Sequence, residues 1–298
     1  MNPDASLPRL RRSFLFVPGS DEKKLAKAPN LGADSVILDL EDAVSPALKV
    51  EARSRIRAFL RTQDGQAIEW LIRLNGFQTA YFEADLEASV RAGPDVLVIP
   101  KVDSPEVLQL VDGRLGAAEH ALALPAGSLK FFVLIESARG ILNAPAIATA
   151  SSRLLGLMLG HVDLSADLGI RAGRAGEGIV HHARCQLVLA ARAAGVDAVD
   201  TVFLNIHDHE GLRAEAIQAA ALGFTGKLAI HPAQIPIIHD AFTPSADRVE
   251  RAKRVLETWR QMEVEGRGVC TLDGDLIEKP VVEAERRILE RARGARIQ

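Results

Sequence analysis

The hydrophobic residues of the chain fall into short runs that are separated by longer segments with helical spacing. The runs are rich in Val, Ile and Leu and lack polar alternation, a pattern typical of parallel strands covered on both faces. They predict eight buried strands: Ser13–Val17, Ser35–Asp39, Trp70–Leu74, Asp95–Pro100, Phe131–Glu136, Leu154–Leu159, Ala198–Leu204 and Leu228–His231.

The segments between the runs are long enough for the helices that connect parallel strands. Thr79–Ala92, Pro105–Leu115 and Gly211–Leu222 repeat hydrophobic residues at i, i+3 and i+4, which predicts helices with one buried face. Strands and helices that alternate in this way predict an α/β fold. Eight strands in one chain favour a (β/α)8 TIM barrel, with a doubly wound open sheet as the alternative.

The chain continues beyond the last predicted strand. A helical segment at Ser245–Glu265 is followed by the Gly-rich turn GRGVCTLDGDL and by a last helix from Val281 onward. We therefore expect a TIM-barrel catalytic domain at 1–243 and a C-terminal helical extension at 244–298. The extension could be a lid, an oligomer arm or a helix that only packs.

Composition narrows the class of protein. Of the 298 residues, 48% are hydrophobic and 25% charged, as in soluble globular proteins, and the net charge of −3 argues against a general nucleic-acid binder. The apolar run before Pro18 is too short for a signal peptide or a membrane helix. Cys185 and Cys270 show no disulfide or zinc spacing, so a cytoplasmic location is expected.

Polar residues gather where the predicted strands end, which in a TIM barrel is the catalytic face. They are Asp39, Glu41 and Asp42 after the second run, Arg73 and Asn75 after the third, Lys101 after the fourth, Glu136 after the fifth, Asp163 after the sixth and His231 after the eighth. Their convergence on one end of the barrel is stronger evidence for a site than any one of them.

Glu136 and Asp163 are the candidate metal ligands. Mg²⁺ takes oxygen ligands, commonly one or two carboxylates, and fills its octahedron with water and substrate. Alternatively, each carboxylate caps a helix or pairs with a buried arginine such as Arg73. Both interpretations are open at this point.

Arg73 and Asp42 are candidates for the chemistry itself. Arg73 could bind a carboxylate or neutralise a developing enolate, or it could pair with the acidic residues that follow the second strand. Asp42 could orient a metal-bound water or cap the following segment.

The first loop, VPGSDEKKLAKAP, places lysines at the start of a helix. Lys23 and Lys27 are four residues apart and therefore share a helical face. They could bind a polyphosphate such as that of coenzyme A, or they could form a solvated lysine face.

Several motifs in order along the chain resemble one family. RRSFLFVPGSDEKK, VILDLEDAV, LIRLNG, VIPKVDSPE, VLIESARGILNA, LGHVDLSADLG and GFTGKLAIHPAQI follow one another as in citrate lyase β-subunit-like proteins. These belong to the HpcH/HpaI aldolase superfamily, with malyl-CoA and citramalyl-CoA lyases as relatives. The VPGSDEKK segment is most similar to the citramalyl-CoA lyase-like branch.

The resemblance implies a set of roles. Glu136 and Asp163 would bind Mg²⁺, Glu136 and Arg73 would meet the substrate, and Phe16, Lys23 and Lys27 would contact coenzyme A. A homo-oligomer, trimer or hexamer, is implied, in which the C-terminal segment reaches a neighbouring subunit's site.

One motif departs from the family. Where G-x-M-I-D-x-P carries an acid–base aspartate in the lyase branch, this chain reads DGDLIEKP, so Glu278 stands at that position. The resemblance implies that Glu278 transfers the proton, although the longer side chain displaces the carboxylate, and about 1 Å of misplacement costs on the order of 10²-fold in rate. A different substrate, or a tail that only packs, are the alternatives.

These features predict a Mg²⁺-dependent carbon–carbon lyase. It would cleave, reversibly, a β-hydroxyacyl-CoA such as malyl-CoA or citramalyl-CoA into an acyl-CoA and a 2-oxo acid. One alternative is a class II aldolase that acts on a free 4-hydroxy-2-oxo acid. Another is a non-catalytic barrel that binds a CoA ester.

Overall fold

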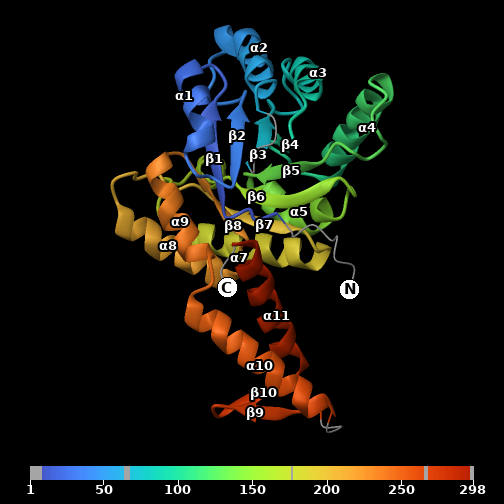
Figure 1. Ribbon diagram of the computed structural model, residues 1–298. Helices are drawn as coiled ribbons and strands as arrows, with labels where there is room; N and C mark the ends of the chain where they lie inside the picture. Colours follow the sequence, from blue (N-terminus) through green and yellow to red (C-terminus); the bar gives the residue numbers. More distant parts are fainter. Residues whose placement is uncertain (1–8, 64–67, 176, 265–267, 296–298) are drawn as a thin grey trace. The chain divides into compact units, whose positions relative to one another are not determined.

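Eight parallel strands form a closed barrel in the computed structural model, which describes residues 9–63, 68–175, 177–264 and 268–295. Each strand pairs with the next one along the chain, and β8 pairs with β1 to close the ring (Figure 1). The predicted TIM barrel is confirmed. The strands are β1 (Ser13–Pro18), β2 (Ser35–Asp39), β3 (Glu69–Arg73), β4 (Val96–Ile99), β5 (Phe131–Ile135), β6 (Leu154–Leu159), β7 (Asp197–Asp200) and β8 (Gly226–Ala229).

Helices lie outside the barrel and connect its strands (Figure 1). The connecting α-helices are α1 (Glu22–Lys27), α2 (Lys49–Leu60), α3 (Phe82–Ala92), α4 (Pro105–Ala121), α5 (Ala138–Ala148), α6 (His161–Asp167), α7 (Gly178–Ala194) and α8 (His209–Leu222), and α9 (Ile235–Phe242) follows the last strand. Short 3₁₀ helices are η1 (Ala28–Asn30), η2 (Pro46–Leu48) and η3 (Pro232–Gln234).

The predicted strand bounds agree with the structure at both ends in two of the eight barrel strands. β2 and β6 begin and end at the predicted residues. β8 begins at Gly226 rather than at Leu228, because the charged Lys227 belongs to the strand and is 0% exposed. A buried lysine is tolerated there because it is paired with acidic side chains, a contact that the hydrophobic pattern does not reveal.

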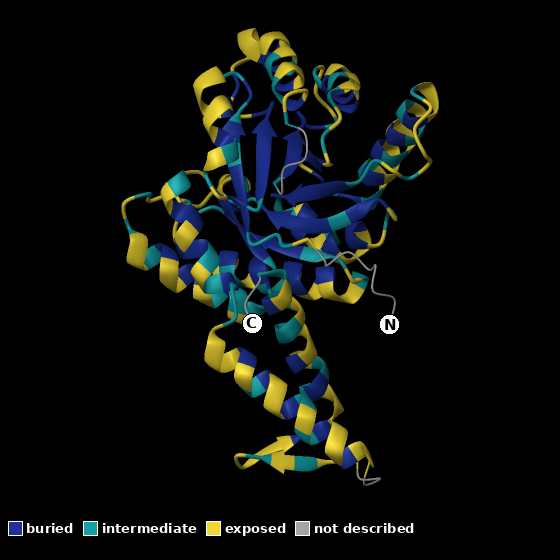
Figure 2. Ribbon diagram, in the orientation of Figure 1, coloured by how far each residue is buried: buried dark blue, intermediate teal, exposed yellow. Residues whose placement is uncertain are grey.

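The barrel interior is filled by apolar side chains. The barrel strands are mostly buried, whereas the outer helices alternate between buried and exposed residues (Figure 2). Phe14 and Phe132 meet edge to face inside the barrel, with ring centroids 5.4 Å apart. Because the interior is packed, chemistry is confined to the strand ends. The interior residues are Phe14, Ile37, Leu71, Val96, Val98, Phe132, Leu134, Met158, Val199 and Leu228.

The chain divides into two compact units. The barrel unit runs from Arg11 to His239, and the second unit joins the N-terminal segment up to Leu10 with the chain from Asp240 onward. The predicted boundary lay between residues 243 and 244. In the second unit, the first residues thus group with the C-terminal extension: a β-carbon on Gly294 would lie 2.9 Å from the side chain of Leu10.

The C-terminal unit is a pair of helices with a hairpin between them. It consists of α10 (Ala246–Val264), β9 (Cys270–Leu272), β10 (Asp275–Ile277) and α11 (Lys279–Gly294). The hairpin replaces the simple turn that the sequence predicted. Its two-residue loop, Asp273-Gly274, has φ values of 52° and 89°, the left-handed pair that Asp-Gly adopts readily. A small core holds the unit together: Val255, Trp259, Met262, Ile277 and Val282.

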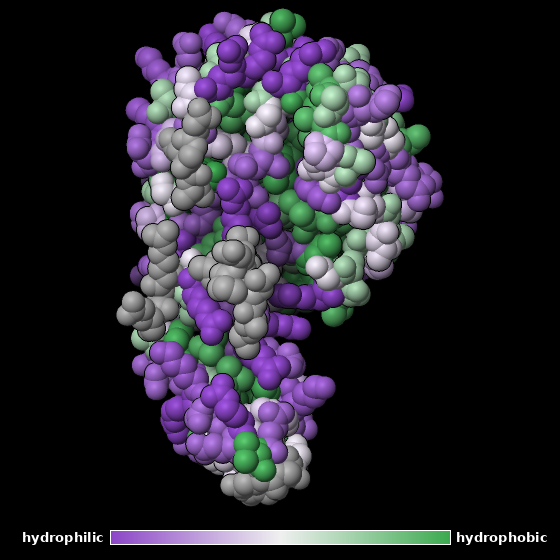
Figure 3. Space-filling model, turned by 45° about the vertical axis from the view of Figure 1, so that its right-hand side comes forward, coloured by the Kyte–Doolittle hydropathy of each residue, from purple (hydrophilic) through white to green (hydrophobic). Residues whose placement is uncertain are grey.

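Within the described ranges, no helix is both long enough and apolar enough to cross a membrane. Figure 3 shows one face, on which hydrophilic side chains prevail and hydrophobic ones gather in smaller patches between them.

Candidate active site

Asp39 and Arg73 form the base of the site at the ends of β2 and β3. The two residues are in register across the strands, and Arg73 Nε and Nη2 each lie 2.7 Å from an Asp39 carboxylate oxygen. The same carboxylate accepts the backbone N–H groups of Glu41 at 2.9 Å and Ala43 at 3.0 Å. Asp39 therefore fixes both the arginine and the loop that carries the next acidic residues.

Arg73 uses its remaining nitrogen at the barrel mouth. Nη1 lies 3.0 Å from Glu41 Oε2 and 3.6 Å from Asp42 Oδ2, and the guanidinium carbon stands 4.7 Å from the centre of the Phe16 ring. Burial alone would lower the pKa of Arg73, but the charges of Asp39, Glu41 and Asp42 raise it above its usual value. The predicted pairing with acidic neighbours is present, and Arg73 also lines a cavity.

Glu136 and Asp163 come from the neighbouring elements β5 and α6. Glu136 directly follows β5, is 5% exposed, and accepts the backbone N–H of Lys101 at 2.7 Å on Oε1. Asp163 lies half-buried in the first turn of α6. A β-carbon at Gly160 would lie 2.5 Å from Glu136 Oε2, so only glycine leaves room for this carboxylate.

Two cavities share these carboxylates. The first, which we call the arginine cavity, measures about 380 Å³ and includes Phe16, Asp39, Asp42 and Arg73 among its lining residues. The second, of about 420 Å³, lies on the side of Lys101 and Thr79. Glu136 and Asp163 line both, so the pair stands between the two spaces.

A third cavity adjoins the arginine cavity through Phe16, Ala43 and Ile230. We call it the lysine cavity; it measures about 370 Å³ and is mainly apolar, with Lys24 and Lys27 in its lining. Lys23, which the sequence singled out, is exposed on α1 and is not one of the lining residues. On helix α1, Lys24 rather than Lys23 therefore lines the lysine cavity together with Lys27.

Electrostatics at the carboxylate pair favour a bound cation. Burial, and then the negative charges of Glu41 and Asp163, raises the pKa of Glu136 to about 8. Among the described residues, no group of three or more His, Cys, Asp and Glu side chains is arranged to hold a metal. Two carboxylate oxygen donors with an excess of negative charge fit a Mg²⁺-type ion that completes its octahedron with water and substrate. Glu136 and Asp163 are the residues that would hold this ion.

Metal-free protein should lose stability as the pH rises. Glu136 holds its proton in the folded protein up to a pKa of about 8, whereas its ordinary pKa is 4.5. The free energy of unfolding should therefore fall between about pH 5 and pH 8, by up to about 4 kcal/mol. Urea denaturation in EDTA measures this slope, and Glu136→Gln should flatten it. An equal slope in both proteins would contradict the assignment.

Asp42 and Glu278, the other two predicted catalytic residues, are exposed. Asp42 is 55% exposed, lines the arginine cavity and lies 3.8 Å from Lys101 Nζ. Glu278 belongs to the C-terminal unit, where it is the exposed residue directly before α11, and its side chain does not cap that helix. The barrel unit thus brings Asp42 to the carboxylate pair, while Glu278 is carried by the second unit.

Glu41, which the sequence pattern indicated only as a possible partner of Arg73, is buried at the centre of the site. It lies between Arg73 and Lys101, whose Nζ is 2.9 Å from Glu41 Oε1. Burial raises the pKa of Glu41 in spite of these two cations. Its position beside the exposed Asp42 in the sequence gives no sign of this difference in burial.

A buried ion cluster behind the site was also missed. Lys227 Nζ donates to Asp200 at 2.7 Å and to Glu215 at 2.8 Å, and Arg184 Nε donates to Asp200 at 2.9 Å. Arg184, Asp200 and Lys227 are all 0% exposed. The signal in the sequence was a charged residue inside one strand-like run, Asp200, and another directly before the last run, Lys227.

The ion cluster continues into the wall of the arginine cavity. Lys227 Nζ also donates to the carbonyl oxygen of Thr201 at 2.8 Å, and Thr201 Oγ1 lies 2.6 Å from His161 Nδ1 and accepts the His161 backbone N–H at 3.1 Å. Burial lowers the pKa of His161, so this ring is neutral at pH 7. Thr201 therefore fixes the start of α6, which carries Asp163.

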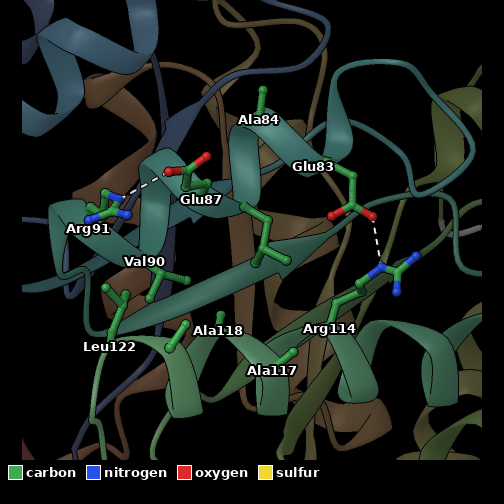
Figure 4. A pocket seen from close by; sticks show the side chains of 11 residues that line it. Glu83, Ala84, Glu87, Val90, Arg91, Arg114, Ala117, Ala118 and Leu122 are labelled. Atoms are coloured by element: carbon green, nitrogen blue, oxygen red, sulfur yellow. Dashed lines mark hydrogen bonds and ion pairs between the residues drawn. The ribbon is translucent and has the colours of Figure 1, made fainter.

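A larger cavity, of about 550 Å³, lies away from the strand ends, between α3 and α4. In Figure 4 its charged residues pair with one another: Arg114 with Glu83 across the groove at 2.8 Å, and Arg91 with Glu87 along α3 at 3.2 Å. Its remaining lining is aliphatic, and it contains no carboxylate that is left for a ligand or a metal. We assign it no part in the chemistry.

Residues 12–232 match the HpcH/HpaI aldolase/citrate lyase family. The chain belongs to this family. It is 40% identical over 286 residues to citrate lyase subunit beta of Haemophilus influenzae, covering 96% of this chain and 98% of that one. It is 39% identical over 287 residues to a (3S)-malyl-CoA thioesterase of Cereibacter sphaeroides, covering 94% of each. The prediction of a citrate lyase β-like enzyme of the lyase class is confirmed.

A solved structure of the family is similar over the whole chain. Protein CitE from Mycobacterium tuberculosis, crystallised with magnesium, acetoacetate and coenzyme A, has a TM-score of 0.78 and 34% sequence identity. The match covers 95% of this chain and 98% of that one. The likeness includes the barrel fold, and that protein's ligands are of the three kinds predicted for this one: a divalent metal, an oxo acid and a coenzyme A.

Proposed function

We propose that this HpcH/HpaI-family member is a Mg²⁺-dependent lyase that cleaves a β-hydroxyacyl-CoA, reversibly, into an acyl-CoA and a 2-oxo acid. Malyl-CoA and citramalyl-CoA are the candidate substrates. The observation that carries the proposal is that one cavity joins the Glu136–Asp163 pair to Arg73, and that it opens beside a mainly apolar cavity with lysines. The first space suits a small anion with a metal, and the second suits the coenzyme A arm.

The reaction needs a proton to leave the substrate hydroxyl. As that proton goes to a base, the oxygen forms a carbonyl, the carbon–carbon bond breaks, and its electron pair goes to the α-carbon of the thioester. The resulting enolate then takes up a proton and becomes the acyl-CoA. Mg²⁺ would supply Lewis acidity and a template for the oxygens of the oxo acid.

The residues of this chain bind the substrate and transfer the proton. Arg73 binds the anionic end of the substrate, and its contacts with Asp39 hold the guanidinium in place. Phe16 stands against the guanidinium and lines both the arginine and the lysine cavity, at the point where the thioester would pass. Asp42 and Glu278 are the candidate proton-transfer residues.

A product assay tests the proposal. Malyl-CoA and citramalyl-CoA are incubated with and without EDTA, and the oxo acid and the acyl-CoA are measured by mass spectrometry. We expect equimolar glyoxylate and acetyl-CoA, or pyruvate and acetyl-CoA, and no product in EDTA. Turnover that is unaffected by metal removal would refute the metal-dependent mechanism.

Thioester hydrolysis is a second candidate, favoured by the 39% identity to a (3S)-malyl-CoA thioesterase. The same assay separates the two, because hydrolysis yields malate and free coenzyme A with no oxo acid. Free thiol can be followed with a thiol reagent. A class II aldolase would instead act on the free hydroxy-oxo acid, and a non-catalytic barrel would bind the ester without any product.

Replacing Lys27 by alanine should raise the KM for a CoA thioester by about tenfold, the effect of one charge contact to a phosphate. Lys23→Ala should have a smaller effect, because Lys27 lines the lysine cavity and Lys23 does not. Steady-state kinetics at low and high salt measure both, since screening should shrink the difference. An equal KM for Lys27→Ala and the unmodified protein would contradict the placement of coenzyme A in this cavity.

We also propose a cytoplasmic homo-oligomer, trimer or hexamer, in which Glu278 acts at a neighbouring subunit's site. Glu278→Gln and Glu136→Gln should each be inactive alone. After subunit exchange, their mixture should regain activity far above the sum of the two, because some sites then combine an intact Glu136 with an intact Glu278. No gain, in mixtures that mass spectrometry shows to be exchanged, would place both residues in one subunit's site.

A further inference from the structure

Lys101 follows β4 and touches two of the carboxylates at the barrel mouth. Its backbone φ of 56° lies in the left-handed region, which residues with a β-carbon rarely adopt. In this conformation its N–H donates to Glu136 Oε1 at 2.7 Å, and its Nζ lies 2.9 Å from Glu41 Oε1. Such a conformation is kept where the surroundings require it, and here it joins one residue to both carboxylates.

Glu41 is held between two cations. Lys101 contacts one of its carboxylate oxygens and Arg73 Nη1 the other, at 3.0 Å. Its backbone is fixed independently, because its carbonyl oxygen accepts from Lys49 Nζ at 3.0 Å. The direction of the Glu41 side chain therefore depends on Lys101 and Arg73, and the position of its backbone does not.

Glu41 lies close to the carboxylate pair. Lys101 contacts Glu41 through Nζ and Glu136 through its backbone N–H, and the negative charge of Glu41 is one of the causes that raise the pKa of Glu136. A carboxylate held by the same residue as Glu136 could become a third ligand of a metal held by Glu136 and Asp163. The described residues nevertheless include no three-residue metal group, as expected if Glu41 is turned toward its two cations.

We propose that Lys101 is a positioning residue that keeps Glu41 against Arg73 and out of the coordination shell of the metal. The inference rests on the proposed Mg²⁺ site. Mg²⁺ has a strict octahedral geometry, so a third protein carboxylate would take a position that a 2-oxo acid needs. Lys101 thereby keeps the site open for substrate.

Calorimetry of four proteins tests this inference: the unmodified chain, Lys101→Met, Glu41→Gln and the double variant. Mg²⁺ is titrated first, and pyruvate is then titrated at saturating Mg²⁺. In Lys101→Met, the released Glu41 should make Mg²⁺ bind about tenfold more tightly and pyruvate about tenfold more weakly. In the double variant both affinities should return to those of Glu41→Gln, because the effect of Lys101 passes through Glu41.

Two further variants serve as controls. Lys101→Gly keeps the N–H bond to Glu136 and adopts a φ of 56° without strain, so it should match Lys101→Met in both titrations. Lys253→Met, at an exposed lysine of α10, should change neither affinity.

Three outcomes would overturn the inference. Weaker pyruvate binding with unchanged Mg²⁺ affinity, not corrected by Glu41→Gln, would mean that Lys101 contacts the oxo acid itself. Loss of both affinities together with a lower Tm would mean a role in folding only. If the unmodified chain binds no Mg²⁺, the proposed function fails, and this inference fails with it.

Discussion

Replacing Glu136 by glutamine is expected to lower kcat/KM for the CoA thioester by at least about 10³-fold. Glutamine keeps the shape of the side chain and can still accept the Lys101 N–H, so what is removed is the charge. A metal ion that stabilises the transition state contributes several kcal/mol, and each 1.4 kcal/mol is a factor of about ten in rate. Steady-state kinetics measures the loss in kcat/KM, and calorimetry measures the accompanying loss in Mg²⁺ affinity.

A matched control is available on the barrel surface. Glu83→Gln removes an exposed carboxylate of α3 that pairs with Arg114, and it should keep full activity. Metal-free Glu136→Gln should be at least as stable at pH 8 as the unmodified protein, because burial and neighbouring charges disfavour the Glu136 carboxylate. A loss of activity at unchanged Mg²⁺ affinity would show that Glu136 serves the reaction without binding the metal.

Replacing Lys227 by methionine is expected to destabilise the barrel by about 3–5 kcal/mol. Lys227 is 0% exposed and donates to Asp200, Glu215 and the carbonyl oxygen of Thr201. Methionine fills the same space but takes one cation from Asp200, which keeps Arg184, and takes the Lys227 charge from the Glu215 carboxylate, which keeps the backbone N–H of Ala175. Chemical denaturation measures the loss as a difference in the free energy of unfolding, with the same denaturant slope for both proteins.

Two comparisons test the reason for this loss. Lys130→Met, at a less buried lysine that donates to the Ser152 carbonyl oxygen at 3.3 Å, should cost less than about 1 kcal/mol. Adding Glu215→Gln to Lys227→Met should recover part of the loss, because it removes the charge that Lys227 neutralised. A loss below about 1 kcal/mol for Lys227→Met alone would show that Arg184 suffices to neutralise the cluster.

The cluster also links stability to the site. Thr201 receives one bond from Lys227 and in turn holds His161 at the start of α6. Lys227→Met should therefore weaken Mg²⁺ binding as well as the fold, whereas Glu136→Gln should weaken Mg²⁺ binding alone.

The sequence by itself determined the elements of the barrel and the residues at its mouth. Parallel strands buried on both faces require continuous apolar runs, so their number and order follow from composition along the chain. Chemistry in such a fold occurs at the strand ends, and this rule selects Arg73, Glu136 and Asp163 from the sequence.

The tertiary structure decided how these side chains are paired. The bond between Arg73 and Asp39 joins residues 34 apart, and that between Lys101 N and Glu136 joins residues 35 apart. Tertiary structure also decides that Glu41 is buried while the adjacent Asp42 is exposed. It likewise decides that Lys24 rather than Lys23 lines the lysine cavity, and that Lys227 is buried in an ion cluster. Pattern and spacing act along the chain, whereas the pairing and desolvation of charges depend on distances that exist only once the barrel has closed.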